Sequence, residues 1–380
     1  MDSRPEVIDA HIHYALPADP AELIRIMDST GTDVANLVIV PHRQRLSSVP
    51  DALMAKAMYP GRFYVFSSLD VSVLFRFRNK VGKRMAEYSR RMLDCGCDGI
   101  KIIEGKPAMR KMLPVPDWDS KVWDPFFDWC EKERIPILWH VNDPETFWDA
   151  EKAPSWAAEQ GWLYDDSFIN NEDQYSQVLN LLERHPRLKI IFAHFFFMSA
   201  QLDRLSSIMD RYPGIMIDIT PGIEMYENFS LDIDKARAFF SRYSDRIVYG
   251  TDIGAKSILS GKASISPEES ACRAAIVRRF LSGGGSWDVP GDGVFLSSKG
   301  GFTMKCLDLD GDTLANILGA NFRRFVGKPP APVNGRAVLK ECRRIRTSLK
   351  IMSLFDRELE ADTSCIEQVD QYFRKRRQRG

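Results

Sequence analysis

The sequence predicts an α/β fold, a (β/α)8 or TIM barrel, on two observations. Short, nearly continuous apolar segments rich in Ile, Val and Phe recur along the chain, as expected for parallel strands that are buried on both faces. Segments with helical periodicity separate them, and eight strand–helix repeats are typical of a closed parallel barrel. The expected strands are 7–13, 35–41, 62–69, 99–103, 135–141, 189–194, 215–220 and 246–252.

The segments between these strands carry apolar residues at helical spacing, together with signals for helix starts and stops. Pro20 stands at one such start, and His185-Pro186 stands at a helix end. Helices are expected over 21–31, 124–134, 172–184, 235–243 and 312–326. The last of these would be the eighth helix of the barrel.

Two segments do not follow the repeat. An insertion at 254–311 separates the eighth strand from its helix and contains an expected helix over 267–281. Because this insertion follows a strand end, a lid over the catalytic face and a plain surface excursion both remain open. The barrel is therefore expected to span 1–327, and 328–380 is expected to form a linker and a helical tail of two helices. The basic run FRKRRQR at its end is interpreted as a solvated terminus rather than a nucleic-acid site.

The bulk composition excludes several classes of partner. Lys+Arg and Asp+Glu both number 52, so the overall charge favours neither nucleic acid nor an anionic membrane. No apolar run is long enough to cross a bilayer, and the first strand starts too early to leave room for a signal peptide. The seven cysteines are scattered, as in proteins with reduced thiols. We expect a cytoplasmic protein that acts on a small molecule, and a homo-oligomer remains open.

Ionisable side chains lie at the C-terminal ends of the expected strands. They are His11, His13, His140, His194 and Asp252. In a barrel of this type, residues from several strand ends converge on one face. Imidazoles and a carboxylate suit a divalent ion such as zinc, which can activate a bound water near neutral pH. A satisfied core histidine is the alternative for His140 or His194 taken singly, but the joint pattern predicts a metal-dependent enzyme.

The segments IDAHIH, ILWH, IIFAH and YGTD, followed by LANILGANFRRFVG, together resemble the amidohydrolase superfamily. The resemblance covers about residues 6–327 and is greatest to the amidohydrolase-2 branch, which includes hydrolases and the aminocarboxymuconate-semialdehyde decarboxylase group. It implies that one divalent metal ion, expected to be Zn²⁺, is bound by His11, His13, His140 and Asp252. It also implies that His194 acts as an acid/base residue beside the metal-bound water, with Asp252 as the other proton carrier.

The fourth strand leaves a choice between one metal ion and two. Dinuclear members of the superfamily use a carboxylated lysine or a glutamate there as a bridge, and this chain has Lys101 and Glu104. The two differ by three positions, so under strict alternation at most one points into the barrel. We favour a mononuclear centre. Lys101 could instead pair with a carboxylate of the substrate or with the site itself.

Three further features concern the substrate. Arg43 and Arg45 follow the second strand and could hold a carboxylate through paired hydrogen bonds, although exposed loop charge is the alternative. Tyr14 follows the histidine pair and could contact substrate or simply pack. Seven of the eight tryptophans lie in the segment from Trp118 to Trp162. They could form an aromatic wall around the substrate, or they could pack a long loop segment onto the barrel.

These features leave three functional classes. The preferred one is a metal-dependent hydrolase that uses a metal-bound water to cleave a C–N or C–O bond in a small, carboxylate-bearing or ring-containing substrate. The alternative is a metal-dependent decarboxylase, a lyase, acting on an unsaturated or aromatic acid. The third is a binding protein that has lost turnover, which the intact set of five site residues disfavours.

Overall fold

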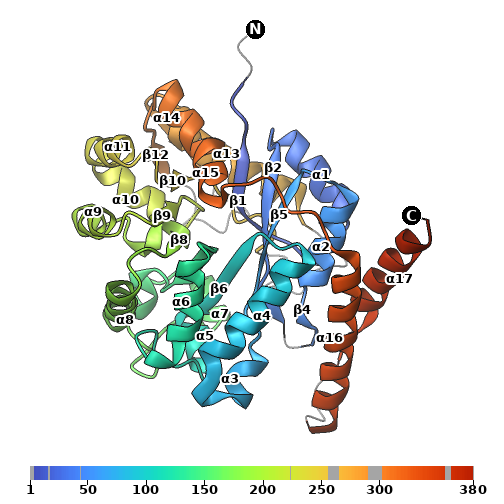
Figure 1. The fold of residues 1–380 in the computed structure, drawn as a ribbon. Helices are drawn as coiled ribbons and strands as arrows, with labels where there is room; N and C mark the ends of the chain where they lie inside the picture. The colour runs from blue at the N-terminus through green and yellow to red at the C-terminus, as the bar shows by residue number, and fades with distance from the viewer. Residues whose placement is uncertain are drawn as a thin grey trace.

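Eight parallel strands form a ring at the centre of the molecule (Figure 1). The computed structural model describes residues 4–15, 18–42, 44–222, 224–255, 265–289, 302–355 and 361–379. In spatial order the strands are β1 (Ile8–His13), β2 (Val34–Val38), β5 (Phe63–Ser67), β6 (Gly99–Gly105), β7 (Pro136–Val141), β8 (Lys189–Phe192), β9 (Ile215–Asp218) and β10 (Ile247–Val248). Each corresponds to one expected strand, so the predicted (β/α)8 barrel is confirmed.

Backbone hydrogen bonds between β1 and the chain around β10 close the ring. The amide of Ala10 donates to the carbonyl of Tyr249 at 2.9 Å, and the amide of Asp252 donates to the carbonyl of His11 at 2.9 Å. A third bond of 2.8 Å runs from the amide of His13 to the carbonyl of Ile253. The same bonds that close the barrel therefore hold the backbone of Asp252 beside that of the histidine pair.

Helices surround the strands on the outside of the ring. They are α1 (Pro20–Ser29), α2 (Val49–Met58), α3 (Ser72–Arg76), α4 (Val81–Cys95), α5 (Pro107–Met112), α6 (Asp124–Lys132), α7 (Ser155–Glu159), α8 (Asn171–Arg184), α9 (Leu202–Arg211), α10 (Met225–Leu231), α11 (Ile233–Arg242), α13 (Pro267–Ser282), α14 (Gly311–Ala315) and α15 (Asn321–Val326). All five expected helices are present. A π turn at Asn316–Ala320 joins α14 to α15, so the expected helix over 312–326 is continuous but widened in its middle. Within the described ranges, no helix has both the length and the apolar character of a membrane span.

Helix starts follow their sequence signals. The Asp19 carboxylate accepts a hydrogen bond from the amide of Ala21 ahead of Pro20, and the Asn170 side chain accepts one from the amide of Asp173 at the start of α8. Such side chains satisfy amides that have no partner within the helix. The remaining strands form two hairpins, β3 (Pro41–His42) with β4 (Leu46–Ser47) and β11 (Ser286–Asp288) with β12 (Thr303–Lys305).

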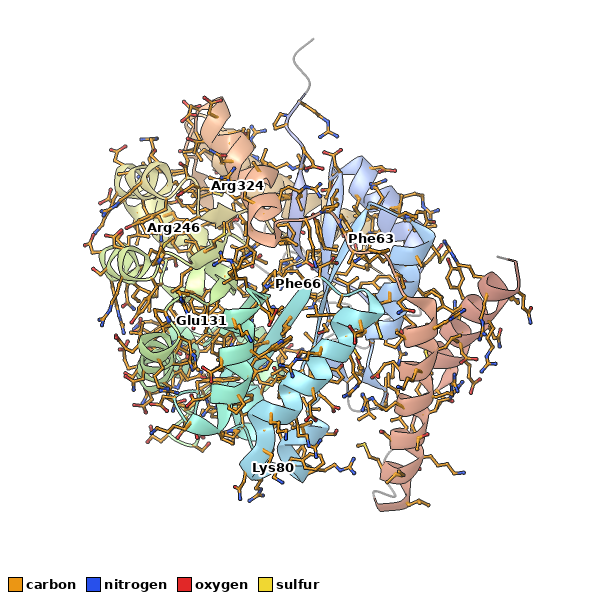
Figure 2. All side chains as sticks on the ribbon, viewed as in Figure 1. Phe63, Phe66, Lys80, Glu131, Arg246 and Arg324 are labelled. Atoms are coloured by element: carbon orange, nitrogen blue, oxygen red, sulfur yellow. The ribbon has the colours of Figure 1, made fainter. Side chains whose placement is uncertain are left out.

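Apolar side chains fill the inside of the barrel. Phe66 of β5 packs there with side chains from most other strands, and Phe322 of α15 adds its ring 5.4 Å from that of Tyr64. Gly99 makes room for this packing, because a Cβ atom there would lie 2.7 Å from the ring of Phe66. In Figure 2, Phe66 lies near the middle of the strands, whereas Lys80 lies at the outer rim. The interior is thus a packed core, and a ligand site has to form at its mouth.

An irregularity in β1 turns the histidine pair toward the inside. The register between β1 and β2 shifts between Asp9 and Ile12. Ala10 belongs to the interior cluster, whereas Ile12 packs in the outer layer beneath the helices. Because a shift of one residue exchanges the two faces of a strand, His11 and His13 point inward above Ala10.

The expected helix of the insertion is confirmed as α13. Its side chains Ile276, Val277, Phe280 and Leu281 are buried in the main core. Residues 256–264 and 290–301 of the insertion lie outside the described residues, and the choice between a lid and a surface excursion falls on them.

The two helices expected in the tail are α16 (Gly335–Phe355) and α17 (Ser364–Arg379), which pack on each other and on α2 and α4. Their buried apolar side chains are Val338, Leu339, Cys342, Ile345, Leu349, Cys365, Ile366, Val369 and Phe373. The connecting segment is anchored as well, since the amide of Ala331 donates to Asp98 at 2.7 Å and that of Asn334 donates to the carbonyl of Cys95 at 3.0 Å. The tail therefore contributes to one core shared with the barrel.

Candidate active site

A cavity of about 520 Å³ lies at the C-terminal ends of the barrel strands. Four of the five predicted ionisable side chains line it, namely His13, His140, His194 and Asp252. The fifth, His11, is completely buried, and its ring lies 5.2 Å from the ring of His13 and 5.4 Å from that of His194. The predicted convergence of strand ends is therefore found in the structure.

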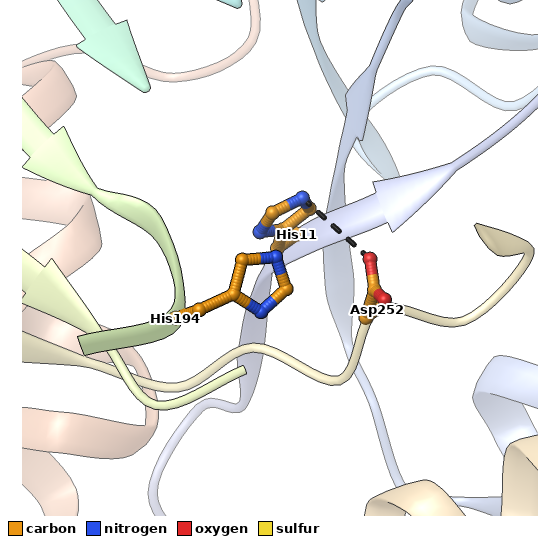
Figure 3. A group of neighbouring side chains, drawn as sticks. All are labelled: His11, His194 and Asp252. Atoms are coloured by element: carbon orange, nitrogen blue, oxygen red, sulfur yellow. Dashed lines mark ion pairs between the residues drawn. The ribbon is translucent and has the colours of Figure 1, made fainter. Parts of the chain in front are cut away.

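His11 is held between a carboxylate and an ammonium group. Its Nδ1 lies 2.9 Å from Oδ2 of Asp218, and its Nε2 lies 3.0 Å from Nζ of Lys101 and 3.7 Å from Oδ1 of Asp252. Since an ionised carboxylate only accepts hydrogen bonds, Nδ1 carries the proton and Nε2 presents its lone pair. Figure 3 shows His11 with His194 and Asp252 at this point.

Asp218 was not predicted from the sequence, although it organises two of the histidines. Besides accepting from His11, it accepts a hydrogen bond from the amide of His194 at 2.7 Å and from the amide of Thr220 at 3.1 Å. It ends β9 as the last residue of IMID, the same kind of position that singled out Asp252. A carboxylate behind an imidazole fixes its tautomer and direction, as in many metal sites.

Asp252 faces the histidines from four residues beyond the end of β10, so the expected eighth strand, 246–252, is shorter than predicted. Its Oδ1 lies 3.2 Å from Nε2 of His13, and its backbone has a φ of 58°, which is unusual for a residue with a side chain. Burial by itself would raise the pKa of Asp252, but the hydrogen bond from His13 and the surrounding imidazoles lower that pKa well below its usual range. The side chain is therefore a carboxylate that can bind a cation or accept a proton.

His194 stands on a turn rather than at the end of a regular strand. β8 ends at Phe192, and the residues from His194 to Phe197 have φ values of 52°, 57°, 57° and 52°. A left-handed conformation costs a residue with a side chain roughly 1–2 kcal/mol, so the surroundings must hold this turn in place. The Nδ1 atom of His194 lies 3.3 Å from the carbonyl of Thr220. The other ring nitrogen, Nε2, is left for the site.

His140 meets a group that sequence reasoning missed. Its Nε2 lies 3.3 Å from Oδ1 of Asp143, and Nζ of Lys106 lies 2.7 Å from both oxygens of that carboxylate. The Tyr164 hydroxyl also donates to Asp143, and Lys106 lies 3.6 Å from the ring centre of Trp162. Burial alone would raise the pKa of Asp143, but Lys106 and His140 lower it to about 2. Only the clustering of charge after two neighbouring strands could have suggested this group.

The residues present fit a divalent cation. One ligand atom each from His11, His194 and Asp252 lies within 4.8 Å of the others. Burial lowers the pKa of His194 to about 3 and also lowers the pKa values of His11 and His140, so these imidazoles are in the neutral form that binds metals. This group contains His194 in place of His13 and His140, which the resemblance implies as ligands. The ring of His140 lies 5.0 Å from that of His194.

The sequence matches the amidohydrolase family model (Amidohydro_2) over residues 74–327, two thirds of the chain. The protein is an amidohydrolase-family member. The resemblance found in its strand ends is thereby confirmed. The comparison with curated proteins found no match to this chain.

Solved structures share the fold of this protein at low sequence identity. The uncharacterized TIM-barrel protein Bb4693 from Bordetella bronchiseptica is 13% identical with a TM-score of 0.52, and it aligns over 85% of this chain and 100% of its own. A Staphylococcus aureus protein named as a candidate amidohydrolase has 18% identity and a TM-score of 0.52 over the same shares. A 2,6-dihydroxybenzoate decarboxylase in complex with 2,6-dihydroxybenzoate has 16% identity and a TM-score of 0.50, again over 85% and 100%. These likenesses concern the fold alone.

On the fourth strand of the amidohydrolase barrel, Lys101 and not Glu104 meets the site. Lys101 contacts His11, and Ile103, two residues on, lines the cavity, as strict alternation requires. Glu104 is fully buried, and its Oε1 has no hydrogen-bond partner among the described residues. Burial lowers the pKa of Lys101 to about 8 and raises that of Glu104 to about 7.

The predicted substrate contacts of Tyr14 and Arg45 are not supported by their positions. Tyr14 is buried in the outer core, and its hydroxyl donates to the carbonyl of Ala18 at 2.9 Å. The Nε of Arg45 lies 2.8 Å from Asp362 ahead of α17, because the tail reaches this side of the barrel. Among the described residues that line the cavity, neither is included. Arg43 lies outside the described residues.

The tryptophans divide between the two expected roles. The rings of Trp118 and Trp123 stack at 4.9 Å, and Trp139 lies edge-on to Trp118 at 4.8 Å, all of them fully buried. These three pack the layer between strands and helices. Trp162 instead lines the cavity, together with Phe147, Phe168 and Phe197. The cavity therefore has an aromatic wall, but most of its aromatic residues are phenylalanines.

Proposed function

We propose that this member of the amidohydrolase family is a metal-dependent hydrolase of a C–N or C–O bond in a small, ring-containing or carboxylate-bearing substrate. The observation that carries the proposal is the convergence of His11, His194 and Asp252 within 4.8 Å at the mouth of the barrel. His194 and Asp252 of this group line a cavity of about 520 Å³, a volume typical of small-molecule sites.

The proposed ligands are His11, His13, His140 and Asp252, with Zn²⁺ as the expected ion. When bound, the ion supplies Lewis acidity toward a carbonyl oxygen and toward water. Asp218 holds His11 with its Nε2 lone pair toward the centre. The neutral imidazole of His194 accepts and returns a proton beside the reacting atoms, as general acid–base catalysis needs. The competing arrangement makes His194 a ligand, as its place in the close group allows.

The walls of the cavity favour an apolar ring in the substrate. Phe147, Trp162, Phe168 and Phe197 supply flat aromatic surface, and Ile103 adds an aliphatic contact. The ammonium of Lys101 lies 3.0 Å from Nε2 of His11, beside the proposed metal ligands, and is our candidate to bind a carboxylate of the substrate, although Lys101 is buried and is not among the described residues that line the cavity. Lys106 is less suited to that role, because both oxygens of Asp143 already neutralise it.

The second candidate function is decarboxylation of an aromatic or unsaturated acid on the same residues. The aromatic cavity supports it, and so does the fold likeness to a 2,6-dihydroxybenzoate decarboxylase. In that reaction Nε2 of His194 would first take a proton from water and then deliver it to the ring carbon, whose bond to the carboxylate breaks to release CO2.

One experiment separates these possibilities. The protein is purified without chelator, its zinc content is measured, and it is assayed against two panels, one of amides, esters and lactones and one of aromatic and unsaturated acids. We expect a bound divalent ion, hydrolysis in the first panel and loss of both in the variant His11→Ala. Release of CO2 from the second panel, without hydrolysis in the first, would favour the decarboxylase. A protein that binds no divalent ion, even on titration, would contradict both and favour a binding protein.

A further inference from the structure

A guanidinium group from the insertion reaches the predicted metal site. Arg273 lies on α13, and its Nη1 is 3.6 Å from Oδ2 of Asp252. Only 1% of the Arg273 side chain is exposed. A buried positive charge beside a metal site repels the cation, so its presence requires a specific reason.

The contact divides the two oxygens of Asp252 between different partners. Oδ1 faces the histidines, at 3.2 Å from Nε2 of His13 and 3.7 Å from Nε2 of His11. Oδ2 faces Arg273. The carboxylate is thereby oriented with one oxygen toward the cation site and the other toward α13.

Arg273 is itself held from several sides. Its Nε lies 3.0 Å from Oε1 of Glu269, one turn earlier on α13, and its Nη1 donates to the carbonyl of Thr251 at 3.4 Å. The helix that carries it is capped by Ser266, whose side chain accepts from the amide of Glu269, and is anchored by its buried apolar side chains. Because the guanidinium is fixed in direction, it can fix the carboxylate that it contacts.

We propose that Arg273 is a positioning residue, which makes Asp252 offer one oxygen rather than two to the divalent ion. This inference rests on the proposed function, since it takes Asp252 as a metal ligand. It makes α13 part of the active site and gives the insertion after the eighth strand a role in catalysis. Binding through a single oxygen keeps a coordination position of the ion open, as metal-dependent catalysis requires.

Removal of the guanidinium has a consequence that distinguishes this role from that of a structural brace. In Arg273→Met both oxygens of Asp252 are released for the ion, and a nearby positive charge is lost. Both changes favour the cation, so the affinity for Zn²⁺ should rise, by about tenfold or more. A brace that only holds the site together would act in the opposite direction, because its loss would disorder the ligands and weaken the affinity.

The test measures Zn²⁺ dissociation constants by competition with a chromophoric chelator, for the full chain and three variants of α13. Arg273→Met is expected to bind Zn²⁺ about tenfold more tightly than the unaltered protein. Arg273→Lys retains the positive charge but loses the fixed direction of the guanidinium, so its dissociation constant should lie between those of the unaltered protein and Arg273→Met. Arg278→Met is the matched control, since Arg278 lies on the same helix but contacts Tyr249 and Thr32 instead, each at 3.4 Å. Its affinity should not change.

Thermal unfolding of each variant without metal shows whether it is folded. If Arg273→Met does not fold, the Zn²⁺ affinity of Arg273→Lys still tests the proposal. Unchanged or weaker Zn²⁺ binding by a folded Arg273→Met would overturn the proposal, as would an Arg273→Lys variant that differs from the unaltered protein as much as the Met variant does. Failure of the proposed function looks different, because the unaltered protein itself would then bind no Zn²⁺ or would release CO2 from acids without hydrolysing any substrate.

Discussion

Asp218 provides the sharpest test of the site, because a single atom replaced there should move a proton on His11. In Asp218→Asn, the remaining oxygen is kept by the amides of His194 and Thr220, which lie 2.7 and 3.1 Å from Oδ1. The new NH2 group then faces Nδ1 of His11, which lies 2.9 Å from Oδ2. Since an NH2 group donates, Nδ1 must accept and the imidazole proton moves to Nε2, the atom that points at the site.

A protonated Nε2 cannot bind a cation, so Asp218→Asn should lose metal affinity. Changes to the carboxylate behind a metal-binding histidine usually cost 10- to 100-fold in affinity, or about 1.4–2.8 kcal/mol. Here we expect the upper part of that range, because both side chains are completely buried. The dissociation constant for Zn²⁺ is measured by chelator competition. Thermal unfolding without metal verifies that the variant is folded.

Asp210→Asn is the matched control, because it makes the same change at a surface carboxylate that pairs with Arg242. A folded Asp218→Asn variant that binds Zn²⁺ within twofold of the unaltered protein would refute the reasoning about the His11 tautomer.

Three other expectations follow from the site, from a buried carboxyl group and from the tail. His11→Ala should retain no divalent ion on elemental analysis, whereas His194→Ala should keep the ion and lose turnover; loss of the ion in both would make His194 a ligand. The pKa of Glu104 is raised from 4.5 to about 7 in the folded protein, so the carboxyl costs stability progressively as pH rises from 4.5 to 7. Urea titrations of Glu104→Gln should therefore show a free energy of unfolding that is higher by up to about 3 kcal/mol at pH 8 and little changed at pH 4. An equal increase at both pH values would contradict ionisation of Glu104 as the cause. Ile345→Ala on α16 should lower the free energy of unfolding by about 2–4 kcal/mol in the same titrations, because the side chain is fully buried. A loss below about 0.5 kcal/mol is typical of a surface substitution and would show that the tail is not part of the core.

The strands were predictable from the sequence because burial on both faces leaves a local sign, a short run of apolar residues. Segments such as IIF in β8 and IMI in β9 carry that sign without reference to any partner. The histidines and Asp252 were found for a related reason, since strand ends converge in any barrel of this type. The family resemblance rested on the same residues and was confirmed.

The residues that hold these side chains in place were not predictable, because their contacts join segments far apart in the chain. Asp218 meets His11 across 207 positions, and Lys106 meets Asp143 across 37. Arg273 was hidden for a further reason, since α13 belongs to an insertion with no counterpart in the strand–helix repeat. For contacts of this kind, the type of a residue does not indicate which distant residue it meets, and the pair is identified only in the folded structure.

The turn from His194 to Phe197 was missed because its sequence contains no glycine, the residue that usually marks a left-handed backbone. The expected strand therefore ran two residues too far. Tertiary packing stabilises the left-handed turn instead, since the ring of Phe196 stacks on that of Phe192 at 3.9 Å.

That turn connects the reacting centre to the outer layer of the protein. Phe195 packs against Phe229 of α10 at 4.8 Å and against Phe239 of α11 at 5.3 Å, while its neighbour His194 faces the cavity. A smaller side chain at either helix position would let the four residues relax and rotate the imidazole. Searches for variants with altered catalysis should therefore sample these two helices, although neither Phe229 nor Phe239 is among the described residues that line the cavity.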